Sequence, residues 1–169
     1  MVHWVRSKLN EQGASAVESF WTASYFDIMN RAKKCYARCL EPICKQWSLT
    51  QNELAVLLFL QNNPSLSRAA DIVTCRGISK SHVSLSVTNL ERRGLLRRRF
   101  DPNDRRMAHL ELTEQGRAIA REGQDAQYRF FSQIHGGITE EDFSLWKKIT
   151  QKVCDNIENL DKVSLDPYE

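Results

Sequence analysis

Basic side chains gather in one stretch of the sequence, residues 76–106. Nine arginines and lysines fall there against three acids, a local excess of six positive charges, whereas the whole chain carries a formal net charge of +3. A polyphosphate attracts such a patch, and the release of bound counterions makes the attraction fall steeply with salt. The simpler interpretation is a solvated charged face that binds nothing. The choice between the two interpretations depends on which helices and strands carry these charges.

The first part of this stretch, residues 79–93, predicts a helix with one buried and one exposed face. Ser79 has the hydroxyl of an N-cap, and apolar side chains recur after it at helical spacing. The candidate DNA-contacting residues are the N-cap and the side chains largely off that stripe: Ser79, Lys80, Ser81, His82, Ser84, Leu85 and Thr88. Short polar groups of this kind contact base edges in a groove, although His82 is equally ordinary as a surface residue.

A two-stranded hairpin is expected directly after this helix. Gly94 lacks a Cβ and so adopts the positive φ that ends a helix at little cost. The residues on either side of segment 101–106 alternate between apolar and polar, and the segment itself, Asp-Pro-Asn-Asp-Arg-Arg, has the residues of a turn. The sequence therefore predicts a β-hairpin over about 95–112 with Arg105 and Arg106 at its tip.

This combination resembles the MarR family of winged helix-turn-helix transcriptional regulators. The resemblance rests on three motifs in order: Leu-Glu-Arg-Arg-Gly-Leu at 90–95, Asp-Pro-Asn-Asp-Arg-Arg at 101–106 and Leu-Glu-Leu-Thr-Glu-Gln-Gly at 110–116. It implies that the helix 79–93 lies in the major groove and that Arg106 enters the minor groove, with Arg105 beside it. Leu85 stands where the family often carries a polar residue, which implies an altered base preference, such as contact with a thymine methyl.

The chain before this unit is expected to be helical. Apolar residues recur every three or four positions from about Ala16 to Ile43, which predicts one long helix whose last turn Pro42 weakens. Thr50 and Glu53 then predict a capping box, in which each side chain bonds the other residue's backbone amide, at the start of a buried helix. These helices are expected to support the basic unit.

Three further helices complete the pattern. Ser67 is expected to start a short helix that ends before Gly77, the first half of the helix-turn-helix, and Thr113 and Thr139 are expected to cap two helices after the hairpin. The last helix carries an apolar stripe at close to seven-residue spacing: Phe143, Trp146, Ile149, Val153, Ile157 and Leu160. An intramolecular core is one interpretation of the stripe. The resemblance favours the other, a symmetric dimer whose recognition helices lie roughly 34 Å apart on an inverted-repeat operator.

The expected fold is mainly α (α+β): a winged helix-turn-helix DNA-binding lobe with a two-stranded wing, plus N- and C-terminal helices that form a dimerisation region. We expect one domain over 1–169. Its expected parts are an N-terminal dimerisation helix (1–48), the winged helix-turn-helix (49–113) and C-terminal dimerisation helices (114–169). No apolar run approaches the roughly 18 residues of a membrane helix, and the first residues lack a secretory pattern, so a cytoplasmic location without membrane contact is expected.

The five cysteines are many for a chain of this size, and their odd number argues against a closed disulfide framework. Cys35 and Cys39 lie four residues apart on one helical face, which makes them candidates for a thiol sensor or for a site that takes a soft metal or an electrophile. The simpler interpretation is two small buried apolar groups. No four-ligand zinc spacing is present, so no metal and no other cofactor is expected.

The resemblance also implies a small-molecule effector, because many MarR relatives bind small aromatic or lipophilic acids between the dimer helices and the DNA-binding lobe. Trp21, Tyr25, Tyr36 and Trp47 are the candidate lining residues. Aromatic residues at helical spacing more often belong to the core than to a pocket. Both interpretations stay open at this point.

Two function classes other than a DNA-binding regulator make different predictions. A winged-helix module that binds an acidic protein surface would show weak, sequence-blind DNA association. An enzyme with a cysteine nucleophile is disfavoured, because no cysteine is accompanied by a spaced histidine and carboxylate pattern or by a glycine-rich phosphate loop. The sequence favours a non-enzymatic homodimer that binds double-stranded DNA as a repressor and responds to a ligand or to thiol oxidation.

Overall fold

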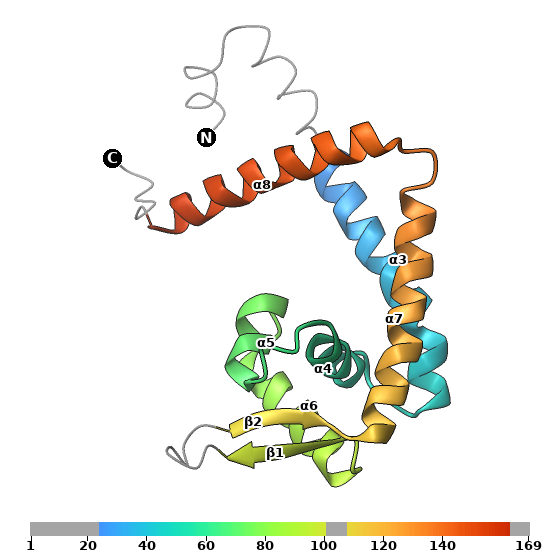
Figure 1. The fold of residues 1–169 in the computed structure, drawn as a ribbon, viewed down its shortest axis with the longest axis vertical. Helices are drawn as coiled ribbons and strands as arrows, with labels where there is room; N and C mark the ends of the chain where they lie inside the picture. Colours follow the sequence, from blue (N-terminus) through green and yellow to red (C-terminus); the bar gives the residue numbers. More distant parts are fainter. Residues whose placement is uncertain (1–23, 101–107, 163–169) are drawn as a thin grey trace, which may run out of the picture. The chain divides into compact units, whose positions relative to one another are not determined.

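A computed structural model describes residues 24–100 and 108–162, and for 24–26 and 160–162 the backbone alone. Within these ranges the chain forms six helices and one two-stranded antiparallel sheet (Figure 1). In chain order the elements are α3 (Ser24–Gln46), α4 (Gln51–Asn62), α5 (Ala69–Arg76), α6 (Lys80–Arg92), β1 (Leu96–Phe100), β2 (Ala108–Leu112), α7 (Glu114–Ile134) and α8 (Glu140–Lys162). The predicted mainly α fold with a two-stranded wing is confirmed. The chain divides into two compact units after Phe130.

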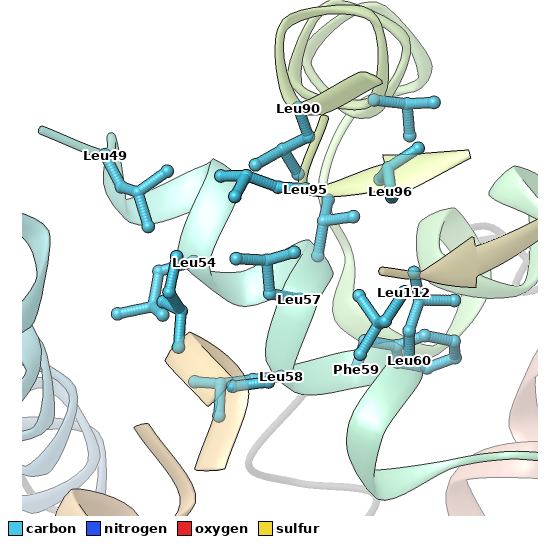
Figure 2. Close-up of a cluster of buried hydrophobic side chains, with 14 of the residues drawn as sticks. Leu49, Leu54, Leu57, Leu58, Phe59, Leu60, Leu90, Leu95, Leu96 and Leu112 are labelled. Carbon is cyan, nitrogen blue, oxygen red and sulfur yellow. The ribbon is translucent and has the colours of Figure 1, made fainter. Parts of the chain in front are cut away.

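The core of the first unit forms around α4. Leu54 and Leu57 of this helix are 0% exposed and Leu58 is 1% exposed, as the run of apolar residues predicts. Figure 2 shows side chains from the α3–α4 link, α4, α6, the residue before β1 and both strands meeting in one cluster, among them Leu49, Leu54, Leu57, Leu58, Phe59, Leu60, Leu90, Leu95, Leu96 and Leu112. The helix-turn-helix and the wing therefore share one core with α4.

The last turn of α3 persists where Pro42 predicts a weakened turn. Pro42 lies inside the helix, which continues to Gln46. A proline removes one backbone donor, but the turn beyond it carries Ile43 and Cys44, which are 8% and 7% exposed. Burial of these two side chains against the core offsets the lost hydrogen bond.

The predicted caps of α4 and α7 are present in the first unit. The N–H of Glu53 donates to Thr50 Oγ1 at 3.2 Å, and the N–H of Thr50 donates to Glu53 Oε2 at 2.8 Å, which confirms the capping box of α4. Thr113 Oγ1 accepts the N–H of Gly116 at 3.1 Å at the start of α7. Both helices begin where local sequence chemistry predicts.

The short helix α5 begins later than its predicted start, Ser67. Ser67 is held by the wing instead: its carbonyl accepts the N–H of Leu110 at 2.7 Å, and its hydroxyl lies 2.7 Å from His109 Nδ1. The N-cap residue is Arg68 instead, and the carboxylate of Asp71 accepts its backbone N–H at 2.9 Å. That hydrogen bond, assisted by the Arg68 guanidinium, lowers the pKa of Asp71.

The wing has the predicted alternation. Leu96 on β1 lies opposite Leu112 on β2, and Phe100 lies opposite Ala108. Leu96, Leu110 and Leu112 are buried, whereas Phe100, at the far end of β1, is 55% exposed. The inner part of the hairpin therefore belongs to the core and its outer part does not.

The second unit contains the last turn of α7 and all of α8. Gly137 makes the turn with a φ of +83°, and Thr139 Oγ1 accepts the N–H of Asp142 at 3.1 Å, the predicted cap of α8. The apolar stripe of α8 is exposed along the helix: Phe143 37%, Trp146 51%, Ile149 53%, Val153 44% and Ile157 53%. Among the described residues, the ring of His135 contacts Phe143 and Trp146, and the rest of the stripe stays about half exposed. Among the helices at residues 24–100 and 108–162, none combines the length and apolarity that a membrane crossing requires.

Candidate nucleic-acid interface

The helix expected over 79–93 is α6, and Ser79 is its N-cap, with its hydroxyl accepting the N–H of His82 at 3.4 Å. Its buried apolar side chains are those of the predicted stripe: Val83, Val87 and Leu90. The predicted DNA-contacting side chains are all exposed: Ser79, Lys80, Ser81, His82, Ser84, Leu85 and Thr88. Ser86, which lies outside the predicted stripe, is also buried, at 4% exposure. The helix thus presents to solvent one face that is polar except for Leu85.

Arg98 ties the wing to α6. Its guanidinium forms an ion pair with the carboxylate of Glu91 and donates to Thr88 Oγ1 at 3.4 Å. The partners of Arg98 on the helix were not visible in the sequence. Because Thr88 belongs to the candidate contact face, this contact fixes the angle between that face and the wing.

Two other wing arginines share one carboxylate. Arg97 Nη2 lies 2.9 Å from Glu111 Oε2, and Arg99 Nη1 lies 3.4 Å from Glu111 Oε1. The hydrogen bond from Arg97 is the main cause that holds the pKa of Glu111 below its ordinary value. Lys80 and Arg92, by contrast, are exposed and have no partner among the described residues. The positive charge of this region is therefore partly neutralised on the wing, whereas Lys80 and Arg92 of α6 carry unpaired charge among the described residues.

The wing tip was predicted to carry Arg105 and Arg106. Both residues lie outside the described ranges, so their contact with a minor groove stays a prediction. The strands that flank the tip are paired out to Phe100 and Ala108.

The geometry of helix, turn, helix and wing matches that of a known family. Residues 47–107 match a family model described as MarR family. The transcriptional repressor MprA of Escherichia coli (strain K12) is 25% identical over 119 residues, which cover 70% of this chain and 68% of MprA. Residues 47–107 are a MarR-family domain. The resemblance drawn from the three sequence motifs is confirmed.

Solved structures share the fold of the MarR-family domain and its flanking helices. A MarR-family transcriptional regulator from Silicibacter pomeroyi has a TM-score of 0.69 at 20% identity, covering 83% of this chain and 94% of its own. A MarR-family transcriptional regulator from Listeria monocytogenes, complexed with a 26mer DNA, has a TM-score of 0.71 at 17% identity, covering 82% and 91%. At these identities the likeness establishes the fold alone.

The two candidate sensor thiols lie on α3, which precedes residues 47–107 in the chain, and their surroundings differ. Cys35 is exposed and accepts a hydrogen bond from Arg38 Nη2 at 3.3 Å, so the interpretation of both thiols as buried does not hold for it. Cys39 is partly buried, and its Sγ donates to the carbonyl of Ala126 at 3.5 Å. Burial raises the pKa of the Cys44 thiol, the least exposed of the five. The described residues hold no group of three or more His, Cys, Asp or Glu placed to bind a metal ion.

The two described aromatic candidates have separate partners. The ring of Tyr36 meets that of Phe130 edge-on, with centroids 5.4 Å apart, and its hydroxyl accepts a hydrogen bond from Gln127 Nε2. Trp47 Nε1 donates to Glu122 Oε2 at 3.0 Å. Trp21 and the side chain of Tyr25 lie outside the described residues.

A small hollow lies between α3, α4 and the end of α5. Its volume is about 230 Å³. It combines apolar side chains with two cations: Tyr36, Leu40, Leu54, Leu58, Lys33 and Arg76. Trp47 is not among the residues that line it. Of the described aromatic candidates, the hollow is lined by Tyr36.

Proposed function

We propose that this chain is a transcriptional repressor that reads double-stranded DNA with the exposed face of α6. The observation that carries the proposal is the division of this helix: Val83, Val87 and Leu90 lie in the core while the polar face from Ser79 to Thr88 is open. A major groove admits one α-helix, and hydroxyl, amine and imidazole groups match the donors and acceptors of base edges there. No catalytic role is proposed for any residue.

Individual side chains on this face differ in what they recognise. Leu85 is 60% exposed and apolar, which suits contact with a thymine methyl. Lys80 and His82 are suited to guanine acceptors. Leu85→Ala is expected to weaken the preference for thymine at one operator position and to leave other positions unchanged, as measured by selection of duplexes from a random pool.

Arg105 and Arg106 are proposed as minor-groove contacts of the wing tip. Arg106→Ala is expected to weaken operator binding by about 1–3 kcal/mol, the range of a good groove contact. The matched control is Arg121→Ala, which removes one exposed cation from α7. Equal affinities of Arg106→Ala and the parent at moderate salt would refute this role.

The deciding experiment compares two duplexes of one length. One is selected by the protein from a random pool, and the other is unselected. Across a series of salt concentrations we expect the selected duplex to bind at least about a thousandfold more tightly. Discrimination of less than about tenfold would favour the alternative function, a winged-helix module for an acidic protein partner with only nonspecific DNA affinity.

A homodimer is proposed because the α8 stripe needs a covering surface. Side chains such as Trp146 and Ile149 are about half exposed, and burying them against a second copy removes apolar surface from water. The dimer would place two copies of α6 on an inverted repeat with half-site centres roughly 34 Å apart. Ile149→Glu is expected to give monomers by sedimentation, whereas Lys148→Glu, one residue away, is expected to leave dimers. Dimers of Ile149→Glu would contradict the assignment.

A small acid is the proposed effector. The hollow beside Tyr36 offers an apolar wall together with the cations of Lys33 and Arg76, which suit a carboxylate. Benzoate is expected to bind and to weaken binding of the selected duplex, and Lys33→Gln is expected to reduce both effects. Benzyl alcohol, which lacks the charge, is the control. Equal effects of the two compounds would remove the acid assignment.

A thiol response is the second proposed input. Oxidation or alkylation at Cys35 or Cys39 is proposed to disturb the dimer and to weaken operator binding. The exposure of Cys35 makes it accessible to a reagent. Peroxide treatment is expected to lower affinity in the parent and in Cys154→Ser but not in Cys35→Ser combined with Cys39→Ser. Unchanged affinity of the treated parent would rule the response out.

A further inference from the structure

The link between α3 and α4 folds back on the end of α3. The N–H of Ser48 donates to the carbonyl of Lys45 at 3.3 Å, and the N–H of Leu49 donates to the carbonyl of Cys44 at 2.8 Å. Ser48 has a φ of +50°, at a position where such helix ends usually carry glycine. A residue with a side chain is strained in this conformation. Surrounding contacts must therefore hold the link in place.

Arg93, at the C-terminal end of α6, supplies two of these contacts. Its Nη2 donates to the carbonyl of Trp47 at 2.6 Å, and its Nη1 donates to the carbonyl of Ser48 at 2.9 Å. Carbonyls at a helix C-terminus lack intrahelical partners, and the helix dipole favours a cation there. Arg93 therefore caps the end of α3, a helix other than its own.

A second contact from α6 reaches the same region one turn earlier. Asn89 Nδ2 donates to Glu53 Oε1 at 3.1 Å, while the other carboxylate oxygen accepts the N–H of Thr50. Glu53 is 5% exposed, so these bonds form where an unpaired carboxylate would be costly. Asn89 and Arg93 are four residues apart and so face the same side of α6. The recognition helix thus docks on the link through two polar side chains.

The third helix at this link is α7. Trp47 Nε1 donates to Glu122 Oε2 at 3.0 Å, and Gln46 Nε2 lies 3.4 Å from the same oxygen. The short link therefore joins α3 by chain continuity, α7 through Glu122 and α6 through Arg93. All of these residues lie in the first unit of the chain.

We propose that Arg93 is a positioning residue for DNA recognition, through which displacements of α3 and α7 reach the recognition helix. The proposal rests on the proposed function, because it requires that α6 reads DNA. The two carbonyls belong to adjacent, rigid peptide planes. A rotation of the end of α3 therefore moves both acceptors, and the planar guanidinium that bridges them carries the end of α6 with it.

The test compares Arg93→Ala with Arg92→Ala in the full chain. Both remove one cation from the same helix end, but Arg92 is exposed and without a partner among the described residues. Affinity is measured by fluorescence anisotropy on the selected and the unselected duplex at one salt concentration. We expect Arg93→Ala to lower the ratio of the two affinities at least about tenfold and Arg92→Ala to change it less than about twofold, since a lost phosphate contact weakens all sequences alike.

Thermal unfolding shows whether each variant is folded at the temperature of measurement. Arg93→Lys keeps the charge but replaces the planar fork with a single ammonium group, so its ratio is expected to lie between those of the parent and Arg93→Ala. This variant provides the test if Arg93→Ala does not fold. An Arg93→Ala ratio equal to the parent's would overturn the positioning role. If both affinities were lowered by the same factor, Arg93 would be a phosphate contact instead.

A spectroscopic measurement follows the link itself. The indole N–H resonance of Trp47 is assigned by its absence from Trp47→Phe. Adding the selected duplex is expected to shift this resonance in the parent and in Arg92→Ala, but not in Arg93→Ala. A parent that discriminates between the duplexes but shows no shift would overturn the coupling alone. A parent that binds both duplexes alike would overturn the proposed function, and the coupling with it.

Discussion

Glu111 on β2 lies directly across the sheet from Arg97 on β1 and accepts its Nε hydrogen bond at 3.0 Å. The same carboxylate is within 3.4 Å of Arg99 Nη1. One acid therefore orients two arginines of the wing and cancels part of their charge. The count of basic residues in the sequence overstates the field that a DNA backbone would meet at this surface.

Glu111→Gln is expected to raise affinity for an unselected duplex and to steepen its salt dependence. The substitution removes one negative charge and frees Arg97 and Arg99 for phosphates, and each added phosphate contact changes the slope of log affinity against log salt by roughly −0.9. The measurement is a salt titration by anisotropy. Glu114→Gln removes the same charge from an exposed position at the start of α7 and is the control. Equal slopes for Glu111→Gln and the parent would contradict this account.

Acid is expected to destabilise the start of α5 through Asp71. Its pKa is lowered in the folded state, first by the backbone N–H of Arg68, so the stabilisation is present above the unfolded-state value and is lost as pH falls through the lower folded-state value. The expected loss therefore falls below about pH 4. Thermal unfolding of Asp71→Asn is expected to depend less on pH in that range than unfolding of the parent. Parallel curves for the two proteins would show that Asp71 does not contribute.

Gly116→Ala is expected to unfold the first unit or to destabilise it by at least about 3 kcal/mol, the upper part of the range for overpacking. A Cβ on Gly116 would lie 1.9 Å from the carbonyl oxygen of Leu95, a backbone atom that cannot rotate away. Urea denaturation measures the change. Gln115→Ala, at the exposed neighbouring position, is expected to change stability by less than about 0.5 kcal/mol. A stable Gly116→Ala protein would mean that α7 and the wing approach less closely.

Ser48→Gly is expected to stabilise the protein by about 0.5–1 kcal/mol, because glycine adopts the positive φ at this helix end without a Cβ penalty. The same substitution at Ser144, an exposed position inside α8, is expected to have the opposite sign, since glycine disfavours helix interiors. Denaturation midpoints of the two variants compare the effects. A destabilised Ser48→Gly protein would show that the strain at this position has been misjudged.

Local chemistry in the sequence predicted the elements of the interface. The spacing of Val83, Val87 and Leu90 indicated which side of α6 is buried, and Thr50 with Glu53 indicated where α4 begins. These signals work because helical periodicity and capping involve residues within a few positions of each other. The three motifs around the wing were specific enough to predict the family as well.

Other relationships depended on residues that meet only after folding. The sequence did not show that Arg93 bonds the α3–α4 link, that Arg98 pairs with Glu91, or that Ser67 is held by the wing rather than capping α5. A pattern of apolar residues reports which face of an element is covered, but it does not report which polar group lies opposite. The choice of long-range partner depends on how the helices pack, so the charges and contacts that orient α6 were decided by the tertiary structure.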